Sequence, residues 1–414
     1  MKFPFVVQSG LTDRQLDRYR RHIDSDESGW HRRFTESIWR RHQHPSNARL
    51  SGWQGEGDRK KRLIHFYDEY GVEGRDFVLR HAYLHLCLGL PREHIDEYRA
   101  AIATGLLEGG WRREADEGND SAPGGAMERW RRGDLVVVLR RYHAHPEDLS
   151  RAPEAPPPAS YASLDIVLRS DGYRLPDDWE RRPWEVFYRV GLRKKLAREE
   201  PQYVGAAALA AHLPAQVELG CGPSIEAGIP HLSTLHRIYG VSRANYGFIF
   251  RAADDDLLTL FRDPEAKFKE MTDIYRACLV ATPTPFYHHL HDLHRRGLLV
   301  GPVITNNFDC QCADLGLPEM SLRRYDWGPY YPQVQHDPRA RSLLVIGVHA
   351  DRRLVQMRAR ERGLRVLFID PEAYVAPDGG AIPYPVEAPQ GDDLFVRATA
   401  HDAFEELHAA LGGR

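Results

Sequence analysis

The chain has 414 residues, and its 56 basic and 59 acidic side chains leave a formal net charge of only −3. The two signs are mixed along the sequence, which excludes the large basic field that holds nucleic acid. Hydrophobic residues make up 42% and charged residues 28%, a globular composition that excludes disordered and membrane-spanning classes. A chain of this length predicts two or three domains.

The cellular location is predicted from the first residues and the cysteines. The start, MKFPFVVQSG, does not combine a charged segment with a long apolar run, the pattern of a secretory signal. The cysteines form an odd set without the spacing of a disulfide framework: Cys87, Cys221, Cys278, Cys310 and Cys312. We therefore expect a cytoplasmic protein that binds neither membrane nor nucleic acid, with a homo-oligomer left open.

Residues 1–150 are predicted to form a mainly α-helical domain. Between residues 63 and 90, apolar side chains recur three or four apart, as on one face of a helix. The run at 134–140 (DLVVVLR) is compatible with a short strand. Seven of the eight tryptophans precede residue 185 and are interpreted as core rather than as a binding surface.

Two histidines in this region raise the alternative of a metal site. His81 and His85 would be one turn apart on a helix, with Asp68 and Glu69 upstream. The stretch 66–91 faintly resembles helical metalloproteins of the haem-oxygenase type but lacks a full ligand set. We favour two polar histidines on a helix face. The remaining roles are an acceptor-binding lid, an oligomer surface or a sensor.

Breaker-rich stretches then interrupt the pattern. Residues 109–126 (GGWRREADEGNDSAPGGA) and 151–160 (RAPEAPPPAS) are typical of loops and extended connectors. Residues 178–198 have helical spacing, with Pro183 near the first turn. Residues 151–204 are therefore predicted to be a linker with a connecting helix.

From residue 205 to 414 the pattern changes, because short apolar runs alternate with helix-length segments. The runs lie at 216–219, 298–305, 342–347 and 364–369. Runs buried on both faces predict an α/β domain, a Rossmann-like parallel sheet with helices on both faces. Such sheets bind ligands beyond the carboxyl ends of their strands.

The first run is followed at once by GCGPSIEAGIP, residues 220–230. Gly220 and Gly222 allow the backbone to approach a pyrophosphate, toward which the following amides can point. Alone, this motif is equally compatible with a tight turn that binds nothing.

Further motifs follow in order. Residues 283–309 read PTPFYHHLHDLHRRGLLVGPVITNNFD, residues 342–349 read SLLVIGVH, residues 365–372 read RVLFIDPE, and Gly391-Asp392-Asp393 precedes the last helix-like segment. Together with the glycine motif, they resemble the sirtuin domain. The matching parts are its Gly-x-Gly-x-Ser opening, its Thr-Gln-Asn-Ile-Asp motif, its Gly-Thr-Ser strand end, and its later strand that contacts the adenosine. The resemblance covers roughly residues 205 to 414.

The resemblance implies that NAD is bound as a substrate and that its nicotinamide–ribose bond is broken. It places Asn307 and Asp309 at the nicotinamide end, where Asp309 can accept from the carboxamide and Asn307 can fix a water or ribose hydroxyl. The catalytic candidates are Asn307, Asp309 and His349. The candidates for holding the dinucleotide are Gly220, Cys221, Gly222, Ser224, Ile229, Pro230, His231, Thr305, Asn307, Asp309, Gly347, Val348, His349 and Asp370.

Two parts of the sirtuin deacylases are missing. Where they carry a His-Gly pair, this chain reads SLRRYDWG at 321–328, so the histidine base is absent and Tyr325 or Asp326 lies nearest. Only Cys310 and Cys312 lie where the zinc module would be, so no structural zinc is predicted.

Histidines occupy two other altered positions. His231 follows the Gly-Ile-Pro segment, and His349 replaces the serine of Gly-Thr-Ser. Either can supply an alternative base or a phosphate contact, and either is also compatible with an exposed or packed side chain. The histidines at 288, 289, 291 and 294 lie on a helix that is structural in the resemblance, so no metal is predicted there.

These departures favour an NAD-consuming enzyme, either a glycohydrolase or a transferase that passes ADP-ribose to a non-peptide acceptor. An NAD-dependent protein lysine deacylase is the first alternative, opposed by the two missing parts. A non-catalytic module that senses NAD or ADP-ribose is the second. Antiviral NAD depletion and small-molecule biosynthesis both use such enzymes, and the sequence does not choose between them.

Overall fold

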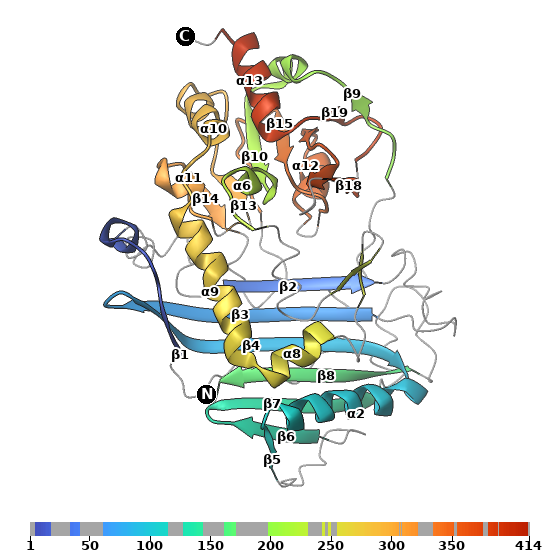
Figure 1. Cartoon of the computed structure of the whole chain (residues 1–414). Helices are drawn as coiled ribbons and strands as arrows, with labels where there is room; N and C mark the ends of the chain where they lie inside the picture. Colours follow the sequence, from blue (N-terminus) through green and yellow to red (C-terminus); the bar gives the residue numbers. More distant parts are fainter. Residues whose placement is uncertain are drawn as a thin grey trace. The chain divides into compact units, whose positions relative to one another are not determined.

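The computed structural model describes residues 5–17, 34–41, 61–114, 127–143, 161–170, 198–230, 242–244, 247–249, 255–305, 307, 309–321, 334–351, 354–375, 380–387 and 389–412. The chain forms two compact units that are interleaved in sequence. The first contains residues 1–11, 31–195 and 232–273, and the second contains 12–30, 196–231 and 274–414. Each unit is built on a sheet of its own (Figure 1). In the described ranges, no helix combines the length and apolarity needed to cross a membrane.

The first unit is built on an antiparallel sheet. Its strand order is β2-β3-β4-β8-β7-β6-β5, and β1 pairs with β4. Helix α2 (Arg92–Glu108) contacts β4, β8 and helix α8 (Asp255–Arg262), as can be followed in Figure 1. The strands are β1 (Phe5–Gln8), β2 (Phe34–Arg41), β3 (Lys61–Glu73), β4 (Asp76–Pro91), β5 (Arg112–Arg113), β6 (Met127–Arg132), β7 (Leu135–His143) and β8 (Tyr161–Ser170).

This sheet corrects the mainly helical prediction for the N-terminal region. Residues 63–90, expected to be a helix, lie in the β3–β4 hairpin, whose tight turn contains Gly74 at φ +60°. Cross-strand pairing along the hairpin outweighs the helix-like spacing, because β structure depends on partners more than on local preference. Strand β7 confirms the short strand expected at 134–140. The helical-turn argument for His81 and His85 also fails, because residues four apart on a strand are about 13 Å apart.

The second unit contains the predicted parallel sheet. Its order is β14-β13-β10-β15-β16-β19-β9, and every neighbouring pair is parallel. Strands β10, β13, β15 and β16 fall on the four apolar runs identified in the sequence. The strands are β9 (Gln202–Tyr203), β10 (Ala215–Leu219), β13 (Val303–Thr305), β14 (Glu319–Ser321), β15 (Ser342–Ile346), β16 (Arg365–Ile369) and β19 (Leu394–Val396).

The order of these strands identifies where a ligand would bind. From β10 the chain passes outward through β13 to β14, then returns to β15 on the other side of β10 and continues to β16 and β19. Apart from the added β9, this is the 3-2-1-4-5-6 order of a doubly wound fold. The order reverses between β10 and β15, and ligands of such folds bind at the carboxyl ends of the strands at this point.

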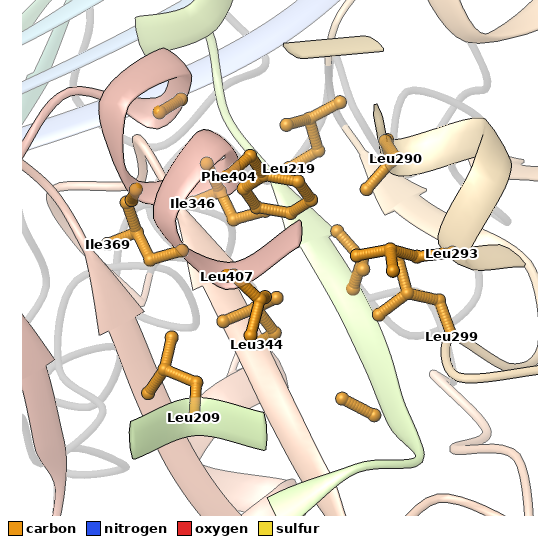
Figure 2. Close-up of a cluster of buried hydrophobic side chains, with 14 of the residues drawn as sticks. Leu209, Leu219, Leu290, Leu293, Leu299, Leu344, Ile346, Ile369, Phe404 and Leu407 are labelled. Atoms are coloured by element: carbon orange, nitrogen blue, oxygen red, sulfur yellow. The ribbon is translucent and has the colours of Figure 1, made fainter. Parts of the chain in front are cut away.

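Helices cover both faces of the parallel sheet, as predicted. Helix α10 (Pro285–Arg295), helix α13 (Ala400–Ala410) and the 3-10 helix η3 (Ala206–His212) pack against one face, where Leu219, Ile346 and Phe404 lie in one buried cluster (Figure 2). Helix α12 (Val355–Glu361) packs against the other face.

The remaining elements are α6 (Gly222–Glu226), β11 (Ser242–Ala244), β12 (Gly247–Ile249), α9 (Pro264–Val280), α11 (Gln311–Asp314), β17 (Ala373–Val375) and β18 (Ala381–Pro383).

The predicted domain boundaries at residues 150 and 204 stay a prediction. The connecting helix expected at 178–198 lies almost wholly outside the described residues.

Candidate functional site

Three glycines bring the loops after β10 and β15 into direct contact. The Gly220 amide donates to the Ile346 carbonyl at 2.9 Å. A Cβ atom on Gly220 would lie 2.1 Å from the Gly347 carbonyl oxygen, and one on Gly222 would lie 3.0 Å from the Gly347 Cα. Gly347 itself has φ +62°, a conformation that side chains disfavour. The glycines are thus required by loop packing at the point where the strand order reverses.

The end of β13 is tied to the same junction. The Thr305 hydroxyl donates to the Leu219 carbonyl at 2.9 Å and accepts from the Asn307 amide at 3.0 Å. The side-chain Nδ2 of Asn307 donates to the Gly220 carbonyl at 2.8 Å. Asn307 is half-buried, so it takes part in the loop contact and is still partly exposed.

Ser224 joins α6 to the loop after β13. Its hydroxyl donates to Asp309 Oδ2, and it lies 3.3 Å from the Tyr287 hydroxyl and 3.5 Å from Asn307 Nδ2. The other carboxylate oxygen, Oδ1, accepts from the Gln311 amide at 3.1 Å. Ser224, Asp309 and Tyr287 are all buried. The carboxylate therefore sits in a site where water screens its charge little.

Tyr287 was not identified from the sequence. Burial raises the pKa of its phenol well above the usual value, and the nearby charge of Asp309 adds to this effect. The phenol therefore stays protonated and available as a donor across the neutral range. The residue belongs to α10, a helix that the sequence indicates, but only packing shows that its hydroxyl meets Ser224.

A short segment after Asn307 has an unusual backbone. Cys310 is buried and has φ +62°, although it is not glycine. This conformation starts α11 and directs the Gln311 amide at Asp309. Burial also raises the pKa of the Cys312 thiol well above its usual value, with Glu319 and Asp309 adding to the shift. Cys310 and Cys312 are both buried in the packing around α11.

A second group lies beyond β15 and β16. His349 Nε2 is 3.8 Å from Asp370 Oδ2, and the imidazole ring lies against the Tyr384 ring with centroids 3.8 Å apart. Asp370 is buried and its Oδ1 accepts from the Glu372 amide at 2.7 Å. Burial, with a smaller effect of the Glu372 charge, raises the pKa of Asp370 to about 7. Asp370 can thus exchange a proton near neutral pH.

Glu372 is neutralised by its own partners. Arg198 donates to Oε1 at 2.7 Å and Arg397 donates to Oε2 at 2.8 Å. Burial alone would raise the pKa of Glu372, but the hydrogen bonds from Arg198, the Val386 amide and Arg397 outweigh it and lower the pKa. The Glu372 carboxylate is therefore ionised and paired with two arginines, whereas burial favours the protonated form of Asp370.

The face of the sheet under α12 holds a pair of acids that sequence reasoning missed, the buried Glu218 and the half-buried Asp351. Burial raises the pKa of Glu218 well above its usual value, and nearby Asp351 adds to the effect. Gln356 donates to Glu218 at 3.1 Å, while Asp351 accepts from the Met357 amide at 2.8 Å. Asp351 thus caps the first turn of α12. This pair belongs to the packing beneath the contact among Gly220, Gly222 and Gly347, which we call the glycine junction.

The structure therefore brings most of the predicted site residues to one edge of the sheet. Ile229 is buried in a small apolar cluster with Cys278 and Ala281, and Pro230 is exposed. Cys221 caps α6, and Val348 packs beside Gly220. Among the predicted residues, His231, Tyr325 and Asp326 lie outside the described part of the chain.

Among the residues that the structure describes, no group of three or more His, Cys, Asp or Glu side chains could hold a metal ion. Among the histidines of α10, His294 lies 3.3 Å from the Gly301 carbonyl, and the His289 ring lies 4.7 Å from that of His408 on α13.

The comparisons with known proteins reveal a distant likeness among solved structures. No family model matches the chain, and no curated protein matches it. A solved structure from a study of the structural basis of sirtuin substrate affinity is 17% identical in sequence and has a TM-score of 0.31. The match covers 50% of this chain and 97% of that one.

Proposed function

We propose that the second unit binds NAD and breaks its nicotinamide–ribose bond, passing ADP-ribose to water or to a small non-peptide acceptor. The observation that carries this proposal is the convergence of Ser224, Asn307 and Asp309 beside Gly220. The cluster lies where the strand order reverses, which is the ligand crevice of doubly wound folds. The sirtuin-like order of the motifs in the sequence points to the same ligand.

The glycine junction suits the pyrophosphate of NAD. With no side chains on Gly220, Gly222 and Gly347, the backbones of the two loops pack directly against each other there. Backbone amides in such a loop are favourable partners for phosphate oxygens, which a bulky side chain would keep away. The absence of side chains that lets the two loops pack together would thus also let phosphates approach the backbone.

Ser224, Asn307 and Asp309 form a polar cluster that suits the bond-breaking step. When the C1′–N bond of the ribose breaks, its electron pair goes to the nicotinamide nitrogen, which leaves neutral, and positive charge develops on the ribose. A buried carboxylate such as Asp309 stabilises that charge more than an exposed one would. Water then forms the new O–C1′ bond and releases its proton, so the products are nicotinamide and ADP-ribose.

Asn307 completes the arrangement. Its Nδ2 is held by the Gly220 carbonyl, so the orientation of its amide is set before any ligand arrives. A fixed amide dipole costs no reorganisation in the transition state. We assign Asn307 to positioning the attacking water or a ribose hydroxyl, and Ser224 and Tyr287 to holding Asp309 in place.

The test is to incubate the whole chain with NAD and quantify nicotinamide and ADP-ribose by chromatography. Asn307→Ala and Asp309→Asn should each lower the rate of nicotinamide release about 100-fold. The matched control is Glu405→Gln, an exposed carboxylate on α13, which should leave the rate unchanged. Circular dichroism of each variant separates lost chemistry from lost folding.

Three outcomes would contradict the proposal. Nicotinamide release that requires an added acetylated peptide would indicate a protein deacylase. Binding of NAD without any release would indicate a sensing module. Failure to bind NAD at all would refute the assignment of the site.

A further inference from the structure

We propose that His349 and Asp370 form a proton-binding pair beside the phosphates of the dinucleotide, so that the site binds them more tightly as the pH falls. This inference rests on the proposed function, because it concerns the pyrophosphate in the same crevice. It adds a regulation by pH that neither the glycine junction nor the polar cluster provides.

The position of the pair follows from the topology. His349 is two residues beyond Gly347, whose backbone is in contact with Gly220 and Gly222. Asp370 directly follows β16, the strand paired with β15. Both residues therefore lie at the carboxyl edge of the sheet, next to the point where the strand order reverses.

The side chains of the pair are held in place. The Glu372 amide fixes Asp370 Oδ1, which leaves Oδ2 facing His349 Nε2 at 3.8 Å. The Tyr384 ring lies against the imidazole, and the Glu387 amide donates to the His349 carbonyl at 2.7 Å. The His349 side chain is 19% exposed and that of Asp370 only 3%, so the pair is shielded from bulk water.

The other charged groups around the pair have contacts of their own, and burial raises the pKa of one of them, Asp351. Glu372 is balanced by Arg198 and Arg397. Asp351, two residues beyond His349, accepts from amides at the start of α12. The groups that pack against the imidazole or follow the pair directly are Asp370, Glu372, Tyr384, Glu387 and Asp351. Of these, Asp370 is the carboxyl whose pKa is raised to about 7.

The charge of the pair changes with each proton it binds. Without a proton its charge is −1, with one proton it is neutral, and with two it is +1. Each proton therefore makes the surroundings of the two negative phosphates more favourable, and by linkage phosphate binding draws protons onto the pair. The two side chains titrate as one system, so the effect belongs to the pair.

The size of the effect follows from the same linkage. If phosphate binding raises the apparent pKa of the pair by about half a unit to one unit, affinity rises about 2.5-fold to fivefold between pH 8 and pH 6. The phosphates of ADP-ribose are diesters whose charge does not change in this range. Any proton uptake therefore comes from the protein.

The experiment measures binding of ADP-ribose to the whole chain by isothermal titration calorimetry. ADP-ribose lacks nicotinamide and is not consumed, so binding is separated from turnover. Titrations at pH 6, 7 and 8, each in two buffers with different heats of ionisation, yield the affinity and the number of protons taken up. The wild type should show uptake near pH 7 and affinity about 2.5-fold to fivefold higher at pH 6 than at pH 8.

Variants assign the effect to the pair. Asp370→Asn removes the negative charge and should bind ADP-ribose more tightly than the wild type at pH 8. The double variant His349→Gln/Asp370→Asn should show no proton uptake and the same affinity at all three pH values. His288→Gln, an exposed histidine on α10, is the matched control and should behave as the wild type.

The outcomes separate this inference from the proposed function. Nicotinamide release combined with pH-independent ADP-ribose binding would overturn the inference alone. Proton uptake that persists in the double variant would overturn it as well. ADP-ribose binding with the expected proton uptake but no nicotinamide release would support the inference and refute the proposed reaction. If ADP-ribose does not bind, both are refuted.

Discussion

Asp370→Asn should stabilise the second unit, and the gain should grow with pH. The carboxyl has an ordinary pKa of 3.8 and a pKa of about 7 in the folded protein, because it is buried after β16. The difference of about three pH units, at about 1.4 kcal/mol for each, corresponds to about 4 kcal/mol. This is the cost of carrying a buried negative charge above pH 7. Asparagine is neutral, and its Oδ1 can still accept from the Glu372 amide.

The direction of the pH dependence follows from the raised pKa. Between about pH 4 and pH 7 the folded state keeps a proton that the unfolded state has lost, so ionisation progressively lowers the stability of the wild type as pH rises. The stabilisation by Asp370→Asn should therefore reach about 4 kcal/mol at pH 8 and fall to about 2 kcal/mol at pH 5.

Urea unfolding followed by circular dichroism at pH 5 and pH 8 measures this difference. Hydrogen exchange in peptides from β16 assigns the transition to the second unit. The exposed Asp392→Asn should show no such pH-dependent gain. The reasoning is refuted if Asp370→Asn is no more stable than the wild type at pH 8, or if its gain is as large at pH 5.

Three further substitutions test the packing. Gly347→Ala should destabilise the protein by at least about 2 kcal/mol more than Gly363→Ala in urea unfolding, because both glycines have positive φ but a Cβ has open space only at Gly363. Equal losses would contradict the loop contact. Thr305→Val should cost about 2 kcal/mol by removing one buried and one partly buried hydrogen bond, and weaker ADP-ribose binding in calorimetry would link this loss to the site. Trp111→Phe should cost about 1–3 kcal/mol in thermal unfolding, because the Phe261 carbonyl loses its indole donor, and an unchanged midpoint would contradict this.

The sequence was a good guide to the second unit and a poor one to the first. In the second unit, each apolar run is a strand buried on both faces, and the burial of β10 and β15 is continuous from end to end. Such runs carry their own signal because most of their residues are apolar. In the first unit, the long hairpin of β3 and β4 has mixed polarity, so its spacing is compatible with a helix until the partner strands are known.

The same division holds for the site. The motifs predicted that Gly220, Ser224, Asn307 and Asp309 share one edge of the sheet, and the hydrogen bonds among them agree with this. Tyr287 had no comparable signal, since a tyrosine on an amphipathic helix is ordinary core material. His349 was noticed as a substitution, but its partner Asp370 and the raised pKa of that carboxyl depend on burial that no local pattern reveals.

By itself, the sequence determined the parallel α/β character of residues 205–414 and the loops in which its polar residues stand. Those features depend on local runs of apolar residues and on glycines at strand ends. Only the tertiary structure decided that the N-terminal region is an antiparallel sheet and that Gly347 is packed against Gly220. It also decided that Asp370 titrates near neutral pH. Strand pairing, close backbone approach and desolvation each depend on residues far apart in the chain, so they are settled only when the chain has folded.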